Sequence, residues 1–388
     1  MKEVSERERD LPFALIGKLL KIASERKDII SLSVGEPDFD APKPIIAEVK
    51  RVARNYKKNR LTHYTAPAGI PELREAIVKK VKKDNKIKTN PDNILVTAGS
   101  QEALFAGFLC TLDPTEEVVL QNPGYLGYIP AIELCNGVPR AVKVTEEENF
   151  EINPDRLKKA INKKTRVIML NTPSNPTGTV IRKKVLEEIA DIAVDKDVYV
   201  FADEAYEKLV YDKNKHVSIG SLNGMEDYVV TLQTFSKSYA MCGFRLGYAV
   251  GPEELIKAMQ NAIHYVTLCP PHISQLVGIK AMSMSEKYIG SMRKEYDRRR
   301  TFIVKRLNEI GLPTRMPGGA FYAFANNSAY SKNSLKFTQK LLKEAKVATV
   351  PGTEFGEFGE GYTRFSYATD YKLIVQAMDR LERLLKKK

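Results

Sequence analysis

The segment around Lys237 combines an amine, a guanidinium and small hydroxyl groups. Thr234 and Ser236 precede Lys237, and Arg245 follows it by eight residues. A lysine can form an imine with a carbonyl compound when its neighbours or burial lower its pKa from about 10.4. The planar guanidinium of Arg245 matches two oxygens of a phosphate, and the hydroxyls can donate to the others. These residue types indicate a bound phosphorylated aldehyde, although composition alone also allows Lys237 to lie on a solvated loop.

Three further polar residues follow apolar runs. Asp203 comes after the run at 198–201, where a buried carboxylate needs a cation or a hydrogen-bond donor as its partner. A protonated pyridine nitrogen is such a partner, and the ring then withdraws electrons from a carbon that loses a proton. Asn175, in the turn sequence 174–178, and Tyr206 can donate to a phenolate oxygen of the same ring. The alternative role for Asp203 is that of an N-cap for a helix over 204–209.

Gly99, Ser100 and Gln101 open a predicted helix. The free backbone N–H groups and the dipole at the start of a helix attract a phosphate. The glycine is equally compatible with a simple turn. Tyr125 is the candidate for an aromatic ring stacked on the cofactor, because the chain contains no tryptophan.

The elements that precede these residues must hold them in place. Short apolar runs alternate with longer amphipathic stretches between residues 92 and 250. Continuous apolar strands separated by helix-length segments predict an α/β domain, with a mostly parallel sheet between helices. Ligands of such sheets bind at the carboxyl ends of the strands, and the candidate residues follow those ends. The predicted strands are residues 94–96, 118–120, 167–170, 198–201 and 229–232.

The C-terminal part of the chain predicts a second, smaller α/β unit. Residues 253–310 have long helical patterns, and later strands are predicted at 321–324 and 364–367. The stretch before Gly35 is too short to fold by itself. We therefore expect a large cofactor-binding domain over residues 45–285, and a small domain of residues 1–44 and 286–388 that closes over the substrate.

The composition of the chain favours small anionic ligands over nucleic acid or a membrane as binding partners. The 388-residue chain has a formal net charge of +13 and is 43% hydrophobic. Its lysines are spread through helical stretches, so anionic ligands explain the excess charge better than nucleic acid does. No apolar run of about 18 residues predicts a membrane span, and the first ten residues lack the apolar core of a signal peptide. We expect a cytoplasmic protein that binds neither nucleic acid nor a membrane.

Neither the cysteines nor the histidines have the spacing of a metal site. The cysteines lie far apart in the sequence, which argues against a disulfide framework and for reduced thiols. We interpret the histidines as surface or packing residues and expect no metal. The residues concerned are Cys110, Cys135, Cys242, Cys269, His63, His216, His264 and His272.

Seven short motifs, in order along the chain, resemble those of a known enzyme family. The sequence is similar to fold-type I, class I aminotransferases that depend on pyridoxal 5'-phosphate (PLP), in particular the archaeal and bacterial branch of aspartate and aromatic aminotransferases. The resemblance runs nearly from end to end. The motifs are residues 35–39 (GEPDF), 63–65 (HYT), 69–74 (GIPELR), 174–178 (SNPTG), 203–206 (DEAY), 236–237 (SK) with 243–247 (GFRLG), and 364–368 (RFSYA).

The resemblance implies roles for the residues that hold the cofactor. Lys237 would bind PLP covalently as an imine and would later move the proton between the substrate and the cofactor. Tyr64 would reach the phosphate bound by the neighbouring subunit, which requires a homodimer. The phosphate would be held by Thr234, Ser236, Arg245 and the backbone amides of Gly99, Ser100 and Gln101.

The resemblance also implies how substrates bind. Arg364 would hold the substrate α-carboxylate through two charge-assisted hydrogen bonds, assisted by the backbone of Gly35 and by Asn175. The reaction would move an amino group from aspartate or an aromatic amino acid to a 2-oxo acid such as 2-oxoglutarate. It would follow a ping-pong route through pyridoxamine phosphate.

The side-chain pocket departs from that of some relatives. Family members devoted to dicarboxylates can use an arginine of the partner subunit near the segment equivalent to 268–273, which contains no arginine here. The pocket is therefore compatible with aromatic substrates. A group that binds the distal carboxylate of 2-oxoglutarate is still required, and Lys18, His272 or backbone amides are the candidates.

Two other functions are compatible with the same pattern. A β-lyase that acts on a cysteine conjugate would use the same residues and release pyruvate and ammonia. A regulator that keeps the fold as a ligand sensor would carry a separate DNA-binding domain of about 60 residues or more. We expect no such extension before residue 12.

Overall fold

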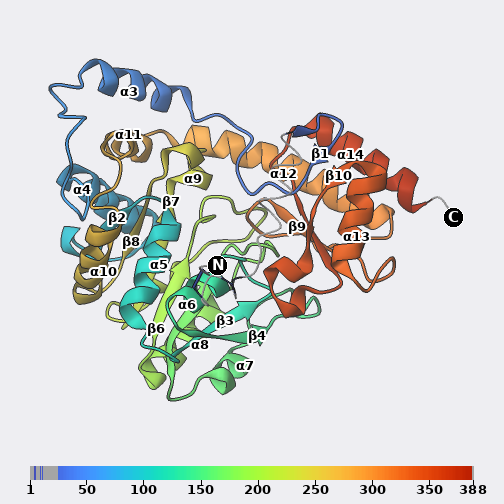
Figure 1. Cartoon of the computed structure of the whole chain (residues 1–388), viewed down its shortest axis with the longest axis horizontal. Helices are drawn as coiled ribbons and strands as arrows, with labels where there is room; N and C mark the ends of the chain where they lie inside the picture. Colours follow the sequence, from blue (N-terminus) through green and yellow to red (C-terminus); the bar gives the residue numbers. More distant parts are fainter. Residues whose placement is uncertain (1–3, 6–8, 10, 12–24, 387–388) are drawn as a thin grey trace.

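The computed structural model of the chain describes residues 4–5, 9, 11 and 25–386. Its strands form a seven-stranded sheet, a three-stranded sheet and a two-stranded pair (Figure 1). The strands are β1 (Ile30–Ser31), β2 (Ile94–Thr97), β3 (Glu117–Asn122), β4 (Val138–Lys143), β5 (Thr165–Asn171), β6 (Tyr199–Asp203), β7 (Val229–Thr234), β8 (Gly247–Val250), β9 (Tyr322–Asn326), β10 (Val347–Ala348), β11 (Val350–Pro351) and β12 (Tyr362–Ser366).

The large sheet has the strand order β2-β8-β7-β6-β5-β3-β4. The five strands from β7 to β4 run parallel to their neighbours, whereas β8 is antiparallel to both β2 and β7. The prediction of a mostly parallel sheet is confirmed. Because β5, β6 and β7 are parallel neighbours, their carboxyl ends lie side by side at one edge of the sheet.

The five strands predicted between residues 94 and 232 are all present in the large sheet, but the other two strands of this sheet were missed. The edge strand β4 carries Pro139 and is largely exposed, so it lacks the continuous apolar run of an inner strand. The other missed strand, β8, is short and begins at Gly247. A Cβ atom on Gly247 would lie 2.5 Å from the Ser100 backbone nitrogen, so the glycine allows β8 to approach the start of the helix that begins at Ser100.

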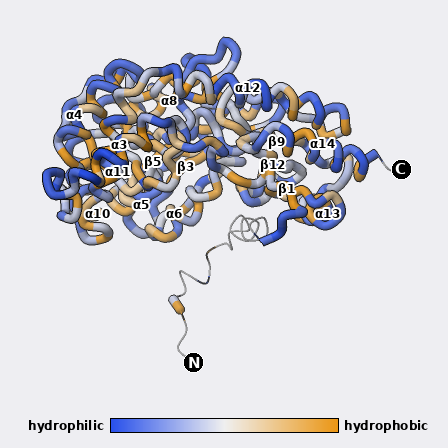
Figure 2. The backbone as a smooth tube through the Cα atoms, turned by 90° about the horizontal axis from the view of Figure 1, so that it is seen from above, coloured by the Kyte–Doolittle hydropathy of each residue, from blue (hydrophilic) through white to orange (hydrophobic). Residues whose placement is uncertain are grey.

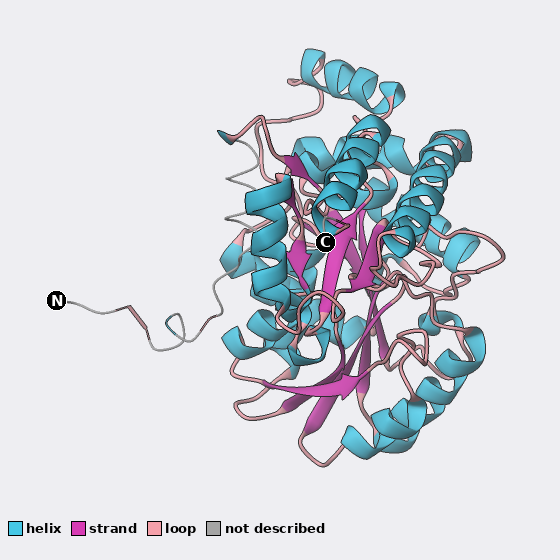
Figure 3. Cartoon of the chain, turned by 90° about the vertical axis from the view of Figure 1, so that its right-hand side faces the viewer, coloured by secondary structure: helices cyan, strands magenta, loops and turns pink. Residues whose placement is uncertain are grey.

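Helices cover both faces of the sheet, as Figure 3 shows. The described helices of more than five residues are α3 (Lys43–Arg54), α4 (Pro71–Lys80), α5 (Ser100–Thr111), α6 (Tyr128–Leu134), α7 (Pro154–Ala160), α8 (Lys183–Lys196), α10 (Glu253–Val266), α11 (His272–Met282), α12 (Glu286–Glu309), α13 (Ser334–Lys340) and α14 (Tyr371–Leu385). Shorter helical segments include η1 (Val81–Asn85) and α9 (Phe235–Ser238).

The alternation of apolar side chains between the two faces of β5 explains why a helix layer packs on each face of the sheet. Ile168 and Leu170 belong to the apolar cluster that includes residues of α8. Val167 and Met169, on the other face of the strand, belong to the cluster that includes residues of α5. Successive side chains of a strand point to opposite faces, so one continuous apolar run builds both cores.

The three-stranded sheet, in the order β11-β12-β9, lies at the other end of the molecule with α13 and α14 (Figures 1 and 2). It shares an apolar cluster with α12 and α14. Residues 30–31 join this part because β1 pairs in parallel with β10. The helical region predicted at 253–310 is present as α10, α11 and α12. Among the described residues, no helix combines the length and the apolar character needed to cross a lipid bilayer.

Candidate active site

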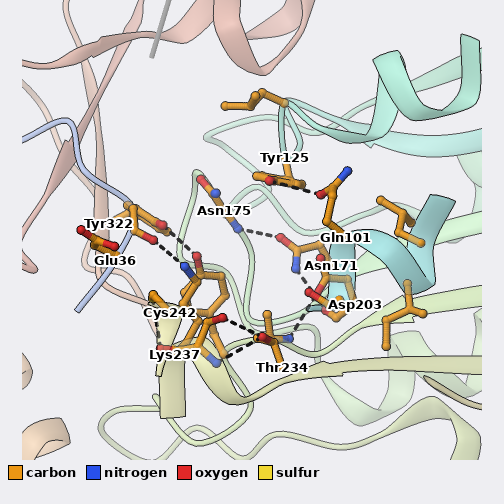
Figure 4. Close-up of a pocket in the computed structure, with 18 of the residues that line it drawn as sticks. Glu36, Gln101, Tyr125, Asn171, Asn175, Asp203, Thr234, Lys237, Cys242 and Tyr322 are labelled. Atoms are coloured by element: carbon orange, nitrogen blue, oxygen red, sulfur yellow. Dashed lines mark hydrogen bonds between the residues drawn. The ribbon is translucent and has the colours of Figure 1, made fainter. Parts of the chain in front are cut away.

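A cavity of about 520 Å³ lies at the carboxyl ends of β5, β6 and β7, where β9 and β12 of the smaller sheet face it (Figure 4). Residues 34–36 close a further side. Twelve predicted site residues line it: Gly35, Ser100, Gln101, Tyr125, Asn175, Asp203, Tyr206, Thr234, Ser236, Lys237, Arg245 and Arg364.

Lys237 lies in the short helix α9, directly after β7. The Thr234 hydroxyl at the end of β7 accepts a hydrogen bond of 3.2 Å from the Ser236 backbone N–H, which caps this helix. The Lys237 Nζ atom donates to the Gly35 carbonyl at 2.6 Å. A Cβ atom at position 35 would lie 2.9 Å from the Tyr322 hydroxyl. The glycine therefore lets the N-terminal segment pass close to Tyr322.

Arg245 and the start of α5 form an anion-binding corner. Gly99 precedes α5 with a φ of 89°, and a Cβ atom there would lie 2.5 Å from Arg245 Nη2. Glycine is required for both the backbone conformation and this close approach. The Thr234 and Ser236 hydroxyls are hydrogen-bonded to each other at 2.9 Å and line the same cavity. A guanidinium, two hydroxyls and a helix N-terminus suit a phosphate.

Asp203 ends β6 as a half-buried carboxylate at the wall of the cavity. Its Oδ2 accepts a hydrogen bond of 2.7 Å from the Tyr128 hydroxyl, and its Oδ1 accepts one of 3.1 Å from the Ala205 backbone N–H. Burial raises the pKa of Asp203 even though Tyr128 and the charge of Lys237 oppose the shift. A cation bound in the cavity next to this carboxylate would stabilise its ionised form.

Arg364 is a guanidinium in the core, with 1% of its surface exposed. Its Nη1 donates to Asn175 Oδ1 at 3.0 Å and its Nη2 to the Ser33 carbonyl at 2.7 Å. The Nε atom is buried without a hydrogen-bond partner, and no carboxylate among the described residues pairs with this side chain. A buried cation without a counterion is costly. The arrangement therefore favours a carboxylate ligand in the cavity.

Aromatic groups surround the remaining space. The Tyr206 hydroxyl is hydrogen-bonded to the Tyr322 hydroxyl at 2.7 Å, and the Arg364 guanidinium lies 4.4 Å from the centre of the Tyr322 ring. Tyr125 packs edge-on against Tyr128, with ring centres 5.2 Å apart. Burial and the charge of Asp203 raise the pKa of Tyr125 to about 12, so its hydroxyl stays protonated at neutral pH.

The sequence did not identify several residues of this site. Tyr128 contacts Asp203 from helix α6, and Tyr322 comes from β9, more than a hundred residues from its partner Tyr206. Asn171 ends β5 and holds the Asn175 backbone N–H at 2.7 Å through its Oδ1. Its position directly after a predicted strand was an available signal. Glu36 also lines the cavity.

Two predicted site residues lie outside the cavity lining. Gly99 stands behind it, against Arg245. Tyr64 is 81% exposed and does not line the cavity of its own chain. Lys18, a candidate for the distal carboxylate, lies outside the described residues. His272 does not line this cavity, and its Nδ1 is buried without a partner.

Two sequence-based interpretations need correction. Residues 205–208 form turns, not a helix, so the alternative of Asp203 as a helix N-cap is wrong, although its Oδ1 binds the Ala205 N–H as in an Asx turn. His216 is not an ordinary surface or packing histidine. Its Nε2 lies 3.0 Å from Glu204 Oε2 in a buried polar cluster that residue spacing in the sequence does not reveal.

The donor set of the cavity fits PLP. The phosphate matches the corner formed by Arg245, Ser236 and the start of α5, and the pyridine nitrogen matches the half-buried Asp203 carboxylate. The aldehyde matches the Lys237 amine. Fold and site together define an enzyme that binds a phosphorylated aldehyde cofactor on a lysine.

Comparisons with known proteins give the family. Residues 27–381 match the class I and II aminotransferases. An aspartate aminotransferase of Pyrococcus abyssi is 46% identical over 376 residues, which cover 96% of each chain. Aromatic-amino-acid aminotransferase 2 of Thermococcus litoralis is 44% identical with the same coverage. The chain therefore belongs to the class I and II aminotransferase family and is a PLP-dependent aminotransferase.

Solved structures agree with this assignment. An aromatic aminotransferase from Pyrococcus horikoshii superimposes with a TM-score of 0.90 at 44% identity, covering 95% of this chain and 99% of that chain. The aspartate aminotransferase of Thermus thermophilus with maleate gives a TM-score of 0.94 at 35% identity, covering 99% and 100%. The fold is that of the fold-type I enzymes.

Proposed function

We propose that this aminotransferase takes the amino group from aspartate or an aromatic amino acid and gives it to a 2-oxo acid such as 2-oxoglutarate. The observation that carries the proposal is Arg364, whose buried guanidinium has an unpartnered Nε atom and no carboxylate partner among the described residues. Every amino acid and every 2-oxo acid brings a carboxylate to this position. Asn175 Oδ1 holds the guanidinium in place at 3.0 Å.

Lys237 and Asp203 carry the chemical step in this proposal. The cofactor, when bound, supplies an electron sink for the carbon that loses its proton. The Lys237 amine would anchor the cofactor and, when free, would move the proton. Asp203 would keep the ring nitrogen protonated, and Asn175, Tyr206 and Tyr125 would hold the ring.

The choice of donor substrate follows from the cavity wall and from the relatives. Relatives at 46% and 44% identity are named for aspartate and for aromatic amino acids. Leu104, Leu126 and Val34 contribute apolar surface to the cavity, and Gln101 contributes an amide. These groups support an aromatic side chain and also offer a donor to a distal carboxylate. We propose activity with both classes of substrate.

A homodimer in the cytoplasm completes the proposal. Tyr64 is exposed in the single chain, as expected for a residue that reaches the phosphate in the neighbouring subunit. Tyr265 and Val266, at the end of α10, are 82% and 62% exposed and supply apolar surface for an interface. None of the four cysteines, all of which lie in the described part of the chain, forms a disulfide, which suits a reducing compartment.

The domain division also stands as a proposal. We infer a large domain of about residues 45–285 and a small domain of residues 1–44 with 286–388. The pairing of β1 with β10 supports the assignment of the N-terminal segment. The second boundary coincides with the start of helix α12 at Glu286. Closure of the small domain would bring Arg364 onto the substrate.

A spectral titration of the purified holoenzyme tests the proposed substrates. Individual amino acids are added without a 2-oxo acid, and the conversion of the cofactor absorbance to the amine form is followed. Aspartate and at least one aromatic amino acid should drive the conversion, and 2-oxoglutarate should reverse it. If neither class of amino acid changes the spectrum, the proposed substrates are wrong.

A further inference from the structure

A buried polar cluster lies behind the strand ends that carry the proposed site. Asp203 and Thr234 end β6 and β7 and line the cavity, whereas their neighbours Glu204 and Gln233 do not. Because successive residues of an extended chain point to opposite sides, Glu204 and Gln233 face away from the cavity. The Gln233 Nε2 atom donates to Glu204 Oε2 at 3.1 Å and to Glu207 Oε2 at 3.0 Å.

The Glu204 carboxylate receives hydrogen bonds from several elements. Its Oε2 accepts from the Ser218 hydroxyl at 2.7 Å and from Asn85 Nδ2 at 3.1 Å. His216 Nε2 lies 3.0 Å from the same oxygen. The Glu204 side chain is fully buried and the His216 side chain is 9% exposed. All of these contacts are made by Oε2, whereas Oε1 is buried without a hydrogen-bond partner, so an ionised Glu204 depends on the donors around Oε2.

Glu207 forms the second half of the cluster. It pairs with Lys80, and both side chains are 6% exposed. Asn85 Nδ2 donates to Glu207 Oε2 at 2.6 Å. Although burial opposes ionisation, the charges of Lys80 and His216 lower the pKa of Glu207 to about 2. Helix α4 and segment η1, which carry Lys80 and Asn85, are thereby tied to the turn after β6.

A metal ion does not explain this cluster. Ligand atoms of Glu204, Glu207 and His216 lie within 4.8 Å of one another. However, the Lys80 ammonium already occupies the position beside Glu207, and the amide nitrogens of Asn85 and Gln233 point at the carboxylate oxygens. These groups are donors that repel a cation. The cluster solvates two carboxylates.

Charge balance in the cluster favours a protonated His216. Two carboxylates and the Lys80 ammonium leave one negative charge in the core, which a protonated His216 would neutralise. Burial alone would lower the pKa of His216, but the charge and hydrogen bond of Glu204 outweigh it and raise this pKa. Other titratable groups lie near the cluster. Lys208, Tyr239 and Tyr248 interact electrostatically with Glu207, and Asp84 interacts with both tyrosines.

We propose that Glu204 and His216 are positioning residues: a protonated His216 paired with the Glu204 carboxylate fixes the turn that presents Asp203 and Tyr206 to the cofactor. Tyr206 lies between the two anchored residues, Glu204 and Glu207. Through Gln233, the same cluster holds the end of β7 that carries Thr234 and leads to Lys237. This proposal rests on the roles proposed above for Asp203 and Tyr206.

The first test is the titration of His216 in the wild-type holoenzyme. With ¹³C-labelled histidine, the four histidines are followed by NMR, and the His216 signal is identified by its loss in His216→Asn. Its midpoint should lie above the ordinary histidine pKa of about 6.5, and it should fall in Glu204→Gln. A wild-type midpoint at or below about 6.5 overturns the proposal. This result does not depend on the role of Asp203, so it is distinguishable from failure of the proposed function.

The second test is a double-mutant cycle. His216→Asn leaves an unbalanced negative charge, and kcat should fall about tenfold with KM for the amino acid within about twofold. In the double variant Glu204→Gln/His216→Asn the cluster is again neutral, so most of this loss should be recovered. Glu187→Gln, in an exposed ion pair of α8, is the control and should match wild type. If the losses in kcat of the two single variants add up in the double variant, the paired role is contradicted. Unfolding curves of each holoenzyme show whether a loss of kcat comes from a loss of folded protein.

Discussion

The Tyr128 hydroxyl donates a hydrogen bond of 2.7 Å to Asp203 Oδ2, and it joins a buried tyrosine to a half-buried carboxylate at the cavity wall. This bond stabilises the ionised carboxylate from the side of helix α6. Burial raises the pKa of Asp203, and the Tyr128 bond is the largest of the effects that oppose the shift. Tyr128 therefore helps to keep Asp203 ionised.

Replacing Tyr128 by phenylalanine should shift the acid side of the pH–activity profile. The pKa of Asp203 should rise further without the hydrogen bond, so the ionised form would be lost at a higher pH as the solution is acidified. We expect the acid limb of kcat to move to higher pH, and kcat at neutral pH to fall about tenfold. The measurement is kcat between pH 5 and pH 9. Tyr330→Phe, which removes a hydroxyl bonded to the Ile310 carbonyl, is the control, and an unchanged limb in Tyr128→Phe would contradict this role.

Asp203→Asn should stabilise the cofactor-free protein while it removes activity. The pKa of Asp203 is raised in the folded protein. Its contribution to the free energy of unfolding is therefore most favourable below the ordinary aspartate pKa. This contribution is lost as the pH rises through the folded-state pKa. At neutral pH the half-buried charge is therefore a cost that asparagine avoids. We expect Tm at pH 7 to rise by about 2 °C or more. The gain should vanish near pH 3, and a lower Tm at pH 7 would contradict the argument.

Arg364→Lys should weaken the binding of every amino acid and 2-oxo acid. Lysine cannot reproduce the planar fork, so at least one charge-assisted hydrogen bond to the substrate carboxylate is lost. We expect KM to rise about 100-fold for donors and acceptors alike. Cofactor absorbance and Tm of the holoenzyme should stay close to wild type. Arg298→Lys, on the exposed face of α12, serves as the control, and a change confined to one substrate would show that the shared carboxylate binds elsewhere.

Hybrid dimers test whether Tyr64 serves the neighbouring subunit. One chain carries Lys237→Ala and the other Tyr64→Ala, and each homodimer should have little activity. In the hybrid, the site with Lys237 receives an intact Tyr64 from the other chain. About half of the wild-type activity per dimer should therefore return. No recovery in a hybrid verified by mass spectrometry would mean that Tyr64 acts within its own chain or not at all.

The sequence predicted the parts of the fold that depend on local patterns. Inner strands such as β3 and β5 are continuous apolar runs because both of their faces are covered. The edge strand β4 has no such pattern, because it is solvent-exposed and contains Pro139. The polar residues after the inner strands were found because parallel strands end at one edge of the sheet.

Residues that reach the site from elsewhere could not be found in this way. Tyr322 meets Tyr206 only through packing of β9 against the turn after β6. His216 meets Glu204 only because the chain folds back beneath that turn. Their spacing in the sequence carries no signal, since these contacts depend on the tertiary arrangement. Lys237 was identified from the residue types around it, whereas Arg364 was identified only because a motif of a known family surrounds it.

The most direct test of the account is chemical trapping of the cofactor on Lys237. The holoenzyme is reduced with borohydride, digested and mapped by mass spectrometry. The cofactor should be found on the peptide that contains Lys237, bound to its Nζ atom, and Lys237→Ala should show no labelled peptide. Labelling of another side chain in the wild-type enzyme, or no labelling at all, would contradict the central claim.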